Sequence, residues 1–172
     1  RADWGRAVSH GGLGVTIFGI CALTAWSVED IRGVQKGESW RVGAYELTLR
    51  DVRDGQGPNY FTTTADIDVS RNGTELGTMT PEKRVYPVAA MPTTEAAIRT
   101  RPFGDLYLAL GDAQKDGGWA VRTYIKPFAV WIWSGAILMA LGGLISLLDR
   151  RYRIAAGAAR RPAPPPLATP AE

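Results

Sequence analysis

Two long stretches without a charged residue constrain this chain more than any other feature. Residues 7–27 and residues 127–148 contain 21 and 22 residues, and neither stretch has an Asp, Glu, Lys or Arg. The hydrocarbon core of a bilayer is about 30 Å thick and is crossed by about 20 apolar helical residues. Because the backbone must satisfy its own hydrogen bonds inside lipid, each stretch is predicted to be a transmembrane helix.

Two other interpretations of these stretches are weaker. A cleaved signal peptide has an apolar region of roughly 7–15 residues, whereas the first stretch is longer and contains His10, so a retained helix is favoured. A buried hairpin of a soluble protein would need apolar neighbours, but residues 28–126 are too polar to enclose it. The lone cysteine, Cys21, lies inside the first helix and is interpreted as a small packing residue.

The distribution of charge predicts the topology. Segment 1–6 carries a net charge of +1, residues 28–126 carry −1, and the tail 149–172 carries +3. Arg150, Arg151 and Arg153 directly follow the second helix, and the positive-inside rule places such clusters in the cytoplasm. We therefore expect a cytoplasmic segment 1–6, a cytoplasmic tail 149–172 and a domain at 28–126 on the outer side, in the periplasm of a Gram-negative cell. The Pro- and Ala-rich tail is predicted to be disordered.

The region between the helices is predicted to be β-rich. Phe61 to Val69 and Tyr45 to Leu49 alternate apolar and polar residues, and Leu106, Leu108 and Leu110 form a further alternating face. Asn72-Gly73 is a hairpin signal, because both central residues of a type I′ turn need a positive φ. Residues 119–124 suit a last strand, residues 54–58 and 113–118 turns, and residues 91–98 a short helix or an irregular crossover. The fold class is thus two transmembrane helices with an inserted antiparallel all-β domain, a small barrel or sandwich.

The β-rich region lacks the residue types of the common catalytic centres. It contains no His and no Cys, which excludes the usual zinc and Cys–His arrangements there. The Gly55 to Tyr60 stretch lacks the Gly-Lys-Ser/Thr ending of a phosphate-binding loop and is interpreted as a turn. Residues 81–84 are interpreted as a solvated turn, and the alternative for them is a partner-binding patch. The sequence contains no basic stripe with interleaved aromatic residues, so it does not indicate a nucleic-acid-binding surface. We assign no catalytic residue to this chain.

His10, the only histidine, is the one candidate site residue. It lies about one turn inside the first helix, where ionisable residues are rare and usually functional. A neutral imidazole is a common axial ligand of haem iron, and Gly11, Gly12 and Gly14 would leave room for a flat porphyrin. The alternative is an interhelical hydrogen bond for His10 and close helix packing for the glycines. These residues alone leave both interpretations open.

Several motifs in order resemble the C-terminal region of the CcmF family. They are Gly57-Pro58-Asn59-Tyr60, Pro81-Glu82-Lys83-Arg84-Val85-Tyr86, Met91-Pro92-Thr93-Thr94-Glu95, Asp105-Leu106-Tyr107, Trp119-Ala120-Val121-Arg122, Lys126-Pro127-Phe128, Trp131-Ile132-Trp133 and Asp149-Arg150-Arg151-Tyr152-Arg153. Each motif is weak alone, but their order and the two helices make the resemblance specific over residues 4–153. The long Pro-Ala tail departs from the family pattern.

The resemblance implies a function that the residues alone do not reveal. CcmF is the large membrane subunit of the bacterial haem lyase that matures c-type cytochromes, and its members hold a transmembrane b haem through two helix histidines. His10 in its Ser-His-Gly setting matches the more C-terminal one. The family's other three histidines and its tryptophan-rich motif do not occur here, so the resemblance implies a C-terminal part of a longer polypeptide. These residues do not distinguish CcmF from a related paralogue that serves nitrite-reductase cytochromes.

The resemblance therefore predicts part of an enzyme of the bacterial inner membrane. The haem lyase would attach haem to the Cys-x-x-Cys-His motif of apocytochrome c in the periplasm, with the b haem reducing the substrate haem. The implied cofactor is haem b, with His10 as an axial ligand of its iron. The implied partners are apocytochrome c, a haem chaperone, accessory lyase subunits and the lipid bilayer, without nucleic acid. The alternative is a non-enzymatic membrane scaffold that presents a β-domain to cytochrome c assembly partners.

Overall fold

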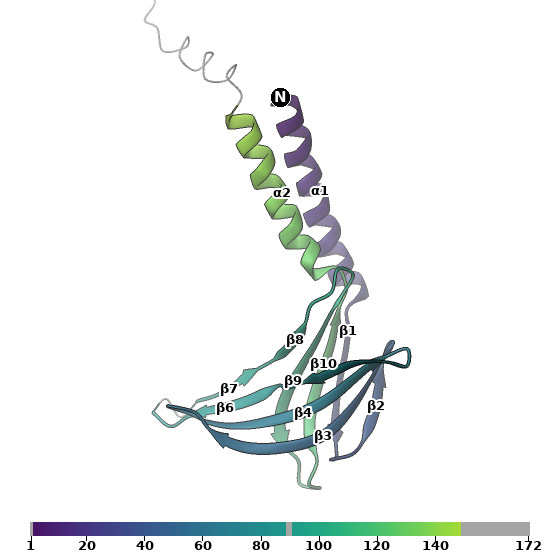
Figure 1. Ribbon diagram of the computed structural model, residues 1–172, viewed down its shortest axis with the longest axis vertical. Helices are drawn as coiled ribbons and strands as arrows, with labels where there is room; N and C mark the ends of the chain where they lie inside the picture. The colour runs from purple at the N-terminus through teal and green to yellow at the C-terminus, as the bar shows by residue number, and fades with distance from the viewer. Residues whose placement is uncertain (1, 89–90, 149–172) are drawn as a thin grey trace, which may run out of the picture. The chain divides into compact units, whose positions relative to one another are not determined.

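The computed structural model describes residues 2–88 and 91–148, as two helices and ten strands in that part of the chain. The elements, in order, are α1 (Ala2–Trp26), β1 (Val28–Val34), β2 (Ser39–Val42), β3 (Tyr45–Gln56), β4 (Phe61–Arg71), β5 (Thr74–Met79), β6 (Glu82–Tyr86), β7 (Met91–Glu95), β8 (Ala97–Arg99), β9 (Asp105–Ala113), β10 (Trp119–Lys126) and α2 (Ala129–Leu147) (Figure 1). Ile17–Ile132 form one compact unit, which holds all ten strands and the adjoining helix ends. The rest of the two helices belongs to a second unit.

The strands form two antiparallel sheets. One sheet has the order β1-β10-β9-β8, so that the first and last strands of the domain are neighbours. The other has the order β2-β3-β4-β6-β7, and β5 pairs with β4 beside β6. The predicted all-β domain between two apolar helices is therefore confirmed, and its strands begin at Val28 and end at Lys126.

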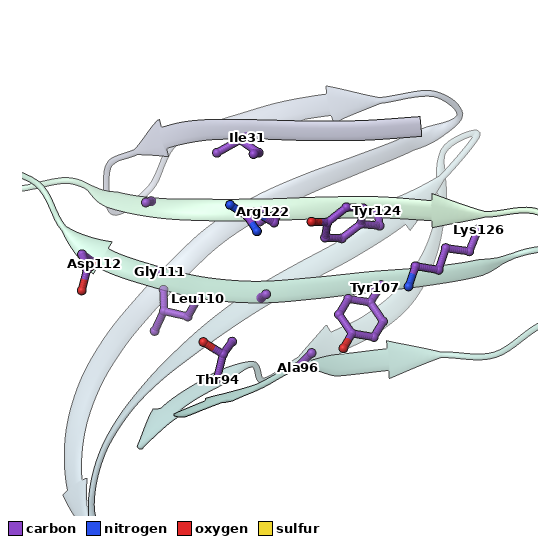
Figure 2. Close-up of a pocket in the computed structure, with 12 residues that line it drawn as sticks. Ile31, Thr94, Ala96, Tyr107, Leu110, Gly111, Asp112, Arg122, Tyr124 and Lys126 are labelled. Carbon is purple, nitrogen blue, oxygen red and sulfur yellow. The ribbon is translucent and has the colours of Figure 1, made fainter. Parts of the chain in front are cut away.

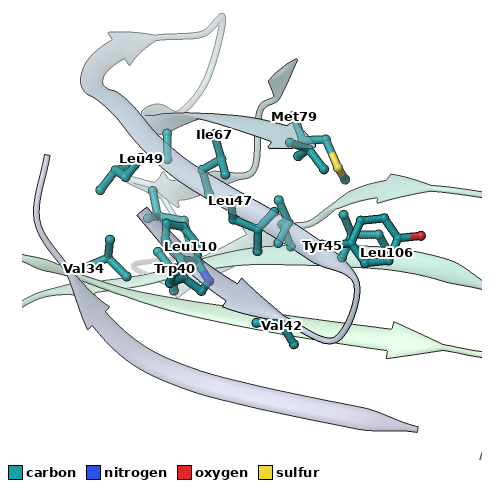
Figure 3. Packing of buried hydrophobic residues seen from close by; sticks show 14 residues of the cluster. Val34, Trp40, Val42, Tyr45, Leu47, Leu49, Ile67, Met79, Leu106 and Leu110 are labelled. Carbon is teal, nitrogen blue, oxygen red and sulfur yellow. The ribbon is translucent and has the colours of Figure 1, made fainter. Parts of the chain in front are cut away.

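The core of the domain lies between the two sheets (Figure 3). Leu47 and Leu49 from β3 and Ile67 from β4 meet Leu106 and Leu108 from β9, and all five are completely buried. The alternation read from the sequence places these side chains on inner faces, because successive residues of a strand point to opposite sides. The apolar face of β4 is buried only from Ala65 onward, and Phe61 at the start of the strand is 53% exposed.

Of two predicted turns, the one at Asn72-Gly73 forms as expected and the one at residues 54–58 begins later than expected. Asn72 and Gly73 have φ values of 48° and 79°, as a type I′ hairpin requires. The turn expected at residues 54–58 begins later, because β3 continues to Gln56 by pairing with Phe61. The Gly57 amide then closes the turn by donating to the Tyr60 carbonyl at 2.8 Å.

Two local predictions were wrong, and non-local pairing explains both. Residues 91–98 form strands β7 and β8, not a helix or crossover, because β7 pairs with β6 and β8 with β9. Residues 82–86 form strand β6 between β4 and β7, so the stretch expected to be a solvated turn lies inside a sheet. Neither segment shows clean alternation, so their sequences gave no local signal for a strand.

Both helices have the length and composition to cross a membrane, over Asp3–Trp26 and Ala129–Leu147. Only 17% and 11% of the residues in their most apolar windows are buried, which is not the pattern of core helices in a soluble domain. The first helix begins at Ala2, so residues 2–6 of the expected cytoplasmic segment are helical, and the second lies within the predicted 127–148. The predicted basic tail, residues 149–172, lies outside the described residues.

Glycines bring the two helices together within the unit that contains Gly12 and Gly135. A Cβ atom at Gly12 would lie 2.7 Å from the Gly135 carbonyl oxygen, and one at Gly142 would lie 2.6 Å from the Gly5 carbonyl oxygen. The Ser9 hydroxyl donates across the pair to the Met139 carbonyl at 3.2 Å. Small residues that let backbones approach are typical of helix pairs in membranes.

Candidate functional site

His10 lies on an exposed face of α1, and its ring is oriented by the helix itself. The Nδ1 atom is 2.9 Å from the Arg6 carbonyl oxygen, one turn earlier. Because a carbonyl oxygen only accepts hydrogen bonds, Nδ1 must carry the proton that it donates. In the neutral form of the ring the lone pair is then on Nε2, and this is the tautomer that binds a metal through Nε2. Ligating histidines almost always donate their other ring N–H in this way.

The structure divides the three glycines beside His10 into two kinds. Gly12 belongs to the helix pair, because a Cβ atom there would lie 2.7 Å from both the Gly135 carbonyl oxygen and the Met139 amide nitrogen. At Gly11 and Gly14, the position that a Cβ would take has no atom within 4 Å apart from the adjacent residues and the nearby backbone of α1 itself. The helix-packing interpretation therefore holds for Gly12. Gly12 serves helix packing, and Gly11 and Gly14 leave space next to His10.

The donor set tests whether a haem suits this face. His10 offers one neutral imidazole nitrogen, with its second nitrogen already satisfied, and small neighbours on an exposed apolar helix. These are the properties of an axial ligand and of a surface that a planar macrocycle could contact. The residues present thus fit one axial position of a haem, and His10 is the only histidine of this chain. In residues 2–88 and 91–148, no group of three His, Cys, Asp or Glu could hold a metal ion.

A separate groove of about 560 Å³ lies on the β-domain (Figure 2). The small residues Ala109, Gly111 and Ala120 contribute to its lining. Tyr107 and Tyr124 stand at one end with Lys126, whose Nζ lies 4.7 Å from the centre of the Tyr107 ring, and Asp112 stands at the other end. The groove therefore combines aromatic, cationic and small residues in the manner of a recognition surface rather than a catalytic centre.

The carboxylates and guanidinium groups with shifted pKa values in the β-domain take part in surface ion pairs. The pKa of Asp51 is below its ordinary value because Lys36 and the Val52 amide donate hydrogen bonds to its carboxylate. The pKa of Arg32 is raised by its hydrogen bond to Asp30, and that of Arg84 by its hydrogen bond to Glu82. Such pairs stabilise the charged forms and supply no acid or base near neutral pH.

A known protein family matches the β-domain of this chain. The model described as the CcmF C-terminal beta-sandwich matches residues 25–127, which is the whole β-domain and its borders. The chain belongs to this family. The resemblance read from the motifs is therefore confirmed.

Relatives extend the match beyond the β-domain. The chain is 56% identical over 160 residues to a cytochrome c-type biogenesis protein, ccl1, from Rhodobacter capsulatus, which covers 93% of this chain and 24% of that protein. It is 46% identical over 151 residues to CcmF of Escherichia coli, covering 87% of this chain and 23% of that protein. Identity to NrfE of Haemophilus influenzae is 31% over 152 residues, covering 88% and 24%.

A solved structure shares the fold. The "Cytochrome c Heme Lyase CcmF" matches with a TM-score of 0.68 and 22% identity, covering 84% of this chain and 24% of that one. The chain thus spans about a quarter of the length of the curated relatives that it matches.

Sequence analysis identified His10 but missed the groups that surround it. The Arg6 carbonyl could have been anticipated, because it lies four residues before His10 and helical spacing places it beneath the ring. The groove was also missed, although Arg122, Tyr124 and Lys126 alternate along β10 and so share one face. Its other walls come from β1, β7 and β9, which only the sheet topology brings together.

Proposed function

We propose that this chain is the C-terminal part of a membrane haem lyase, and that His10 is an axial ligand of a haem held inside the membrane. The family membership supports the first part. The observation that carries the second is the His10 ring, which donates Nδ1–H to the Arg6 carbonyl and leaves Nε2 free to bind iron, in a stretch of helix where the Cβ positions of Gly11 and Gly14 are open. The second axial ligand comes from another part of the protein.

The chemistry of the proposed lyase joins haem to the Cys-x-x-Cys-His motif of apocytochrome c. Each thiol adds to a haem vinyl group, so the apoprotein supplies the nucleophiles and the lyase needs none of its own. The chemistry that a b haem at His10 supplies when bound is one-electron transfer, which in this proposal reduces the iron of the substrate haem. The residues of this chain orient the imidazole and leave space beside it.

The proposed location follows from the charges and helices. The protein of this proposal lies in the bacterial inner membrane, as its family implies. The positive-inside rule then orients it with the β-domain in the periplasm and both ends of this chain in the cytoplasm. The β-domain would then flank the compartment in which a haem chaperone, apocytochrome c and accessory lyase subunits meet. The groove on that domain is a candidate surface for one of these proteins.

Replacing His10 with alanine tests the proposal. We expect the b-type haem content of the purified intact variant to be lower by about tenfold or more. Loss of a group that supports a metal ligand already lowers metal affinity by about 10–100-fold, and loss of the ligand itself should lower it at least as much. The absorption spectrum measures this loss, and cytochrome c yield in cells measures its consequence. Added imidazole should restore part of the spectrum if the defect is a missing ligand.

Thr24→Ala is the matched control for His10→Ala. The Thr24 hydroxyl donates to the Ile20 carbonyl at 2.9 Å, so it makes the same kind of bond one turn back in the same helix. We expect its haem content to be that of the unchanged protein. Normal haem content in His10→Ala, or an equal loss in Thr24→Ala, would overturn the assignment of His10.

A scaffold without enzymatic activity is the second candidate. The exposed groove and the surface ion pairs of the β-domain favour it, because they provide a recognition surface without a catalytic group in the described residues. A colourless intact protein that still assembles its partners would support the scaffold and contradict the haem proposal.

A further inference from the structure

The connection between β8 and β9 carries an exposed aromatic side chain close to the ends of both helices. Phe103 lies in this loop, residues 100–104, and its side chain is 70% exposed. Its ring contacts Phe128 and Trp131, with centroids 6.1 and 6.4 Å away, at the start of α2. Trp26, at the end of α1, contacts Phe128 as well and is 58% exposed. These residues, with Phe18, are named the aromatic junction, and all lie within Ile17–Ile132.

The loop is held against the helix ends by two hydrogen bonds. The indole Nε1 of Trp131 donates to the Pro102 carbonyl at 2.8 Å, and the Phe128 amide donates to the Phe103 carbonyl at 3.4 Å. Phe128 has a φ of 56°, which is unfavourable for a bulky residue. Its ring is the centre of the junction, because it contacts the other four rings. The position of Phe103 is thus coupled to the points at which the chain enters and leaves its apolar helices.

The loop also satisfies much of its backbone internally. The Arg101 amide donates to the Asp105 carboxylate at 3.1 Å, and the Gly104 amide donates to the Arg101 carbonyl at 3.3 Å. Pro102 has no amide hydrogen, and the carbonyls of Pro102 and Phe103 accept the bonds from Trp131 in α2 and from Phe128 just before it. A segment that needs little water for its polar groups can lie at an apolar boundary at low cost.

We propose that the β8–β9 loop is a further membrane contact of this chain, with Phe103 lying in the boundary between lipid headgroups and acyl chains. Aromatic residues are enriched at this depth. Here Trp26 and Trp131 lie near the adjoining ends of the two membrane helices, and the rings of both contact Phe128. The occupant is lipid because the exposed surface is continuous with helices whose outward side chains are apolar. The contact would set the orientation of the β-domain on the bilayer. The inference rests on the membrane helices and does not depend on haem at His10.

A fluorescent probe at position 103 tests the proposal. The intact protein, with Cys21 and any other accessible cysteine replaced, carries Phe103→Cys labelled with an environment-sensitive dye in phosphatidylcholine–phosphatidylglycerol vesicles. We expect blue-shifted emission and quenching by lipids with a nitroxide near the headgroup that is several-fold stronger than quenching by a water-soluble nitroxide. Lys115→Cys is the matched control. Its exposed turn lies at the opposite end of β9 and β10, and its probe should show the reverse preference.

Two results would overturn the proposal. A probe at 103 that is as accessible to the aqueous quencher as the probe at 115 shows that the loop lies in water. A probe that is shielded from water but not quenched by lipid shows that another protein segment covers the loop. Pro102→Cys provides a second site in case Phe103→Cys fails to fold, since the Pro102 side chain is exposed and only its carbonyl bonds to Trp131.

Discussion

Replacing Gly12 with alanine is expected to separate α1 from α2, whereas the same change at the adjacent Gly11 is not. A Cβ at Gly12 would lie 2.7 Å from the Gly135 carbonyl oxygen and from the Met139 amide nitrogen, and 2.9 Å from the Leu138 Cβ. Two of these atoms are backbone, so no side chain can rotate away to make room. At Gly11 the added methyl group meets nothing within 4 Å.

The two variants should differ in the sign of their effect. Overpacking costs about 1–3 kcal/mol, and a clash with backbone lies at the upper end of that range. Alanine is favoured over glycine in a helix by up to about 1 kcal/mol, so Gly11→Ala should be neutral or slightly stabilising. Thermal unfolding of the intact protein in detergent measures both effects. Equal melting temperatures for the two variants would contradict the glycine-mediated packing.

Gly143→Ala in α2 provides a further control for this experiment. It neighbours Gly142, which contacts α1, but its own Cβ position is open. We therefore expect Gly142→Ala to destabilise the helix pair and Gly143→Ala to leave it unchanged. Agreement on both helices would show that the contact face, rather than glycine content, determines the association.

Replacing Leu47 with alanine is expected to lower the free energy of unfolding of the β-domain by about 3 kcal/mol. Leu47 is completely buried between the sheets, so the substitution removes apolar contacts and leaves a cavity in the core. Because native domains are stabilised by only about 5–15 kcal/mol, this loss is a large share of the total. Urea unfolding followed by tryptophan fluorescence in the intact protein measures the shift.

Thr48→Ala is the matched control for Leu47→Ala. Thr48 is the next residue of β3 and faces the other side of the sheet, where its hydroxyl lies 2.8 Å from that of Ser39. Surface substitutions of this kind usually change stability by less than about 0.5 kcal/mol. A Leu47→Ala midpoint close to that of Thr48→Ala would show that the region between the sheets is not a tightly packed core.

The sequence predicted best where the signal was local and repeated. Alternation along β3, β4 and β9 indicated which side chains are buried, and Asn72-Gly73 indicated its turn. Strands β6 and β7 were missed, because Pro81, Pro92 and the polar residues near them interrupt the alternation. Their strand conformation depends on partners that are distant in sequence, such as Phe61 for Val85.

The candidate site divides in the same way. The single histidine within an uncharged stretch identified His10 without any structure. The spacing of Gly5, Gly12 and Gly19, seven residues apart, could have indicated a packing face, because seven residues are close to two helical turns. Nothing local indicated that Phe128 adopts a positive φ or that the β8–β9 loop lies against it.

The amino-acid order alone determined two apolar helices, a β-rich domain between them and one ligand-type side chain in a helix. These properties depend on composition and short-range periodicity, because these decide which residues favour water and which favour an apolar environment. The tertiary structure decided which residues of α2 the packing glycines meet, which strands are neighbours and where Phe103 lies. These depend on contacts between residues far apart in the chain, and no local pattern encodes them.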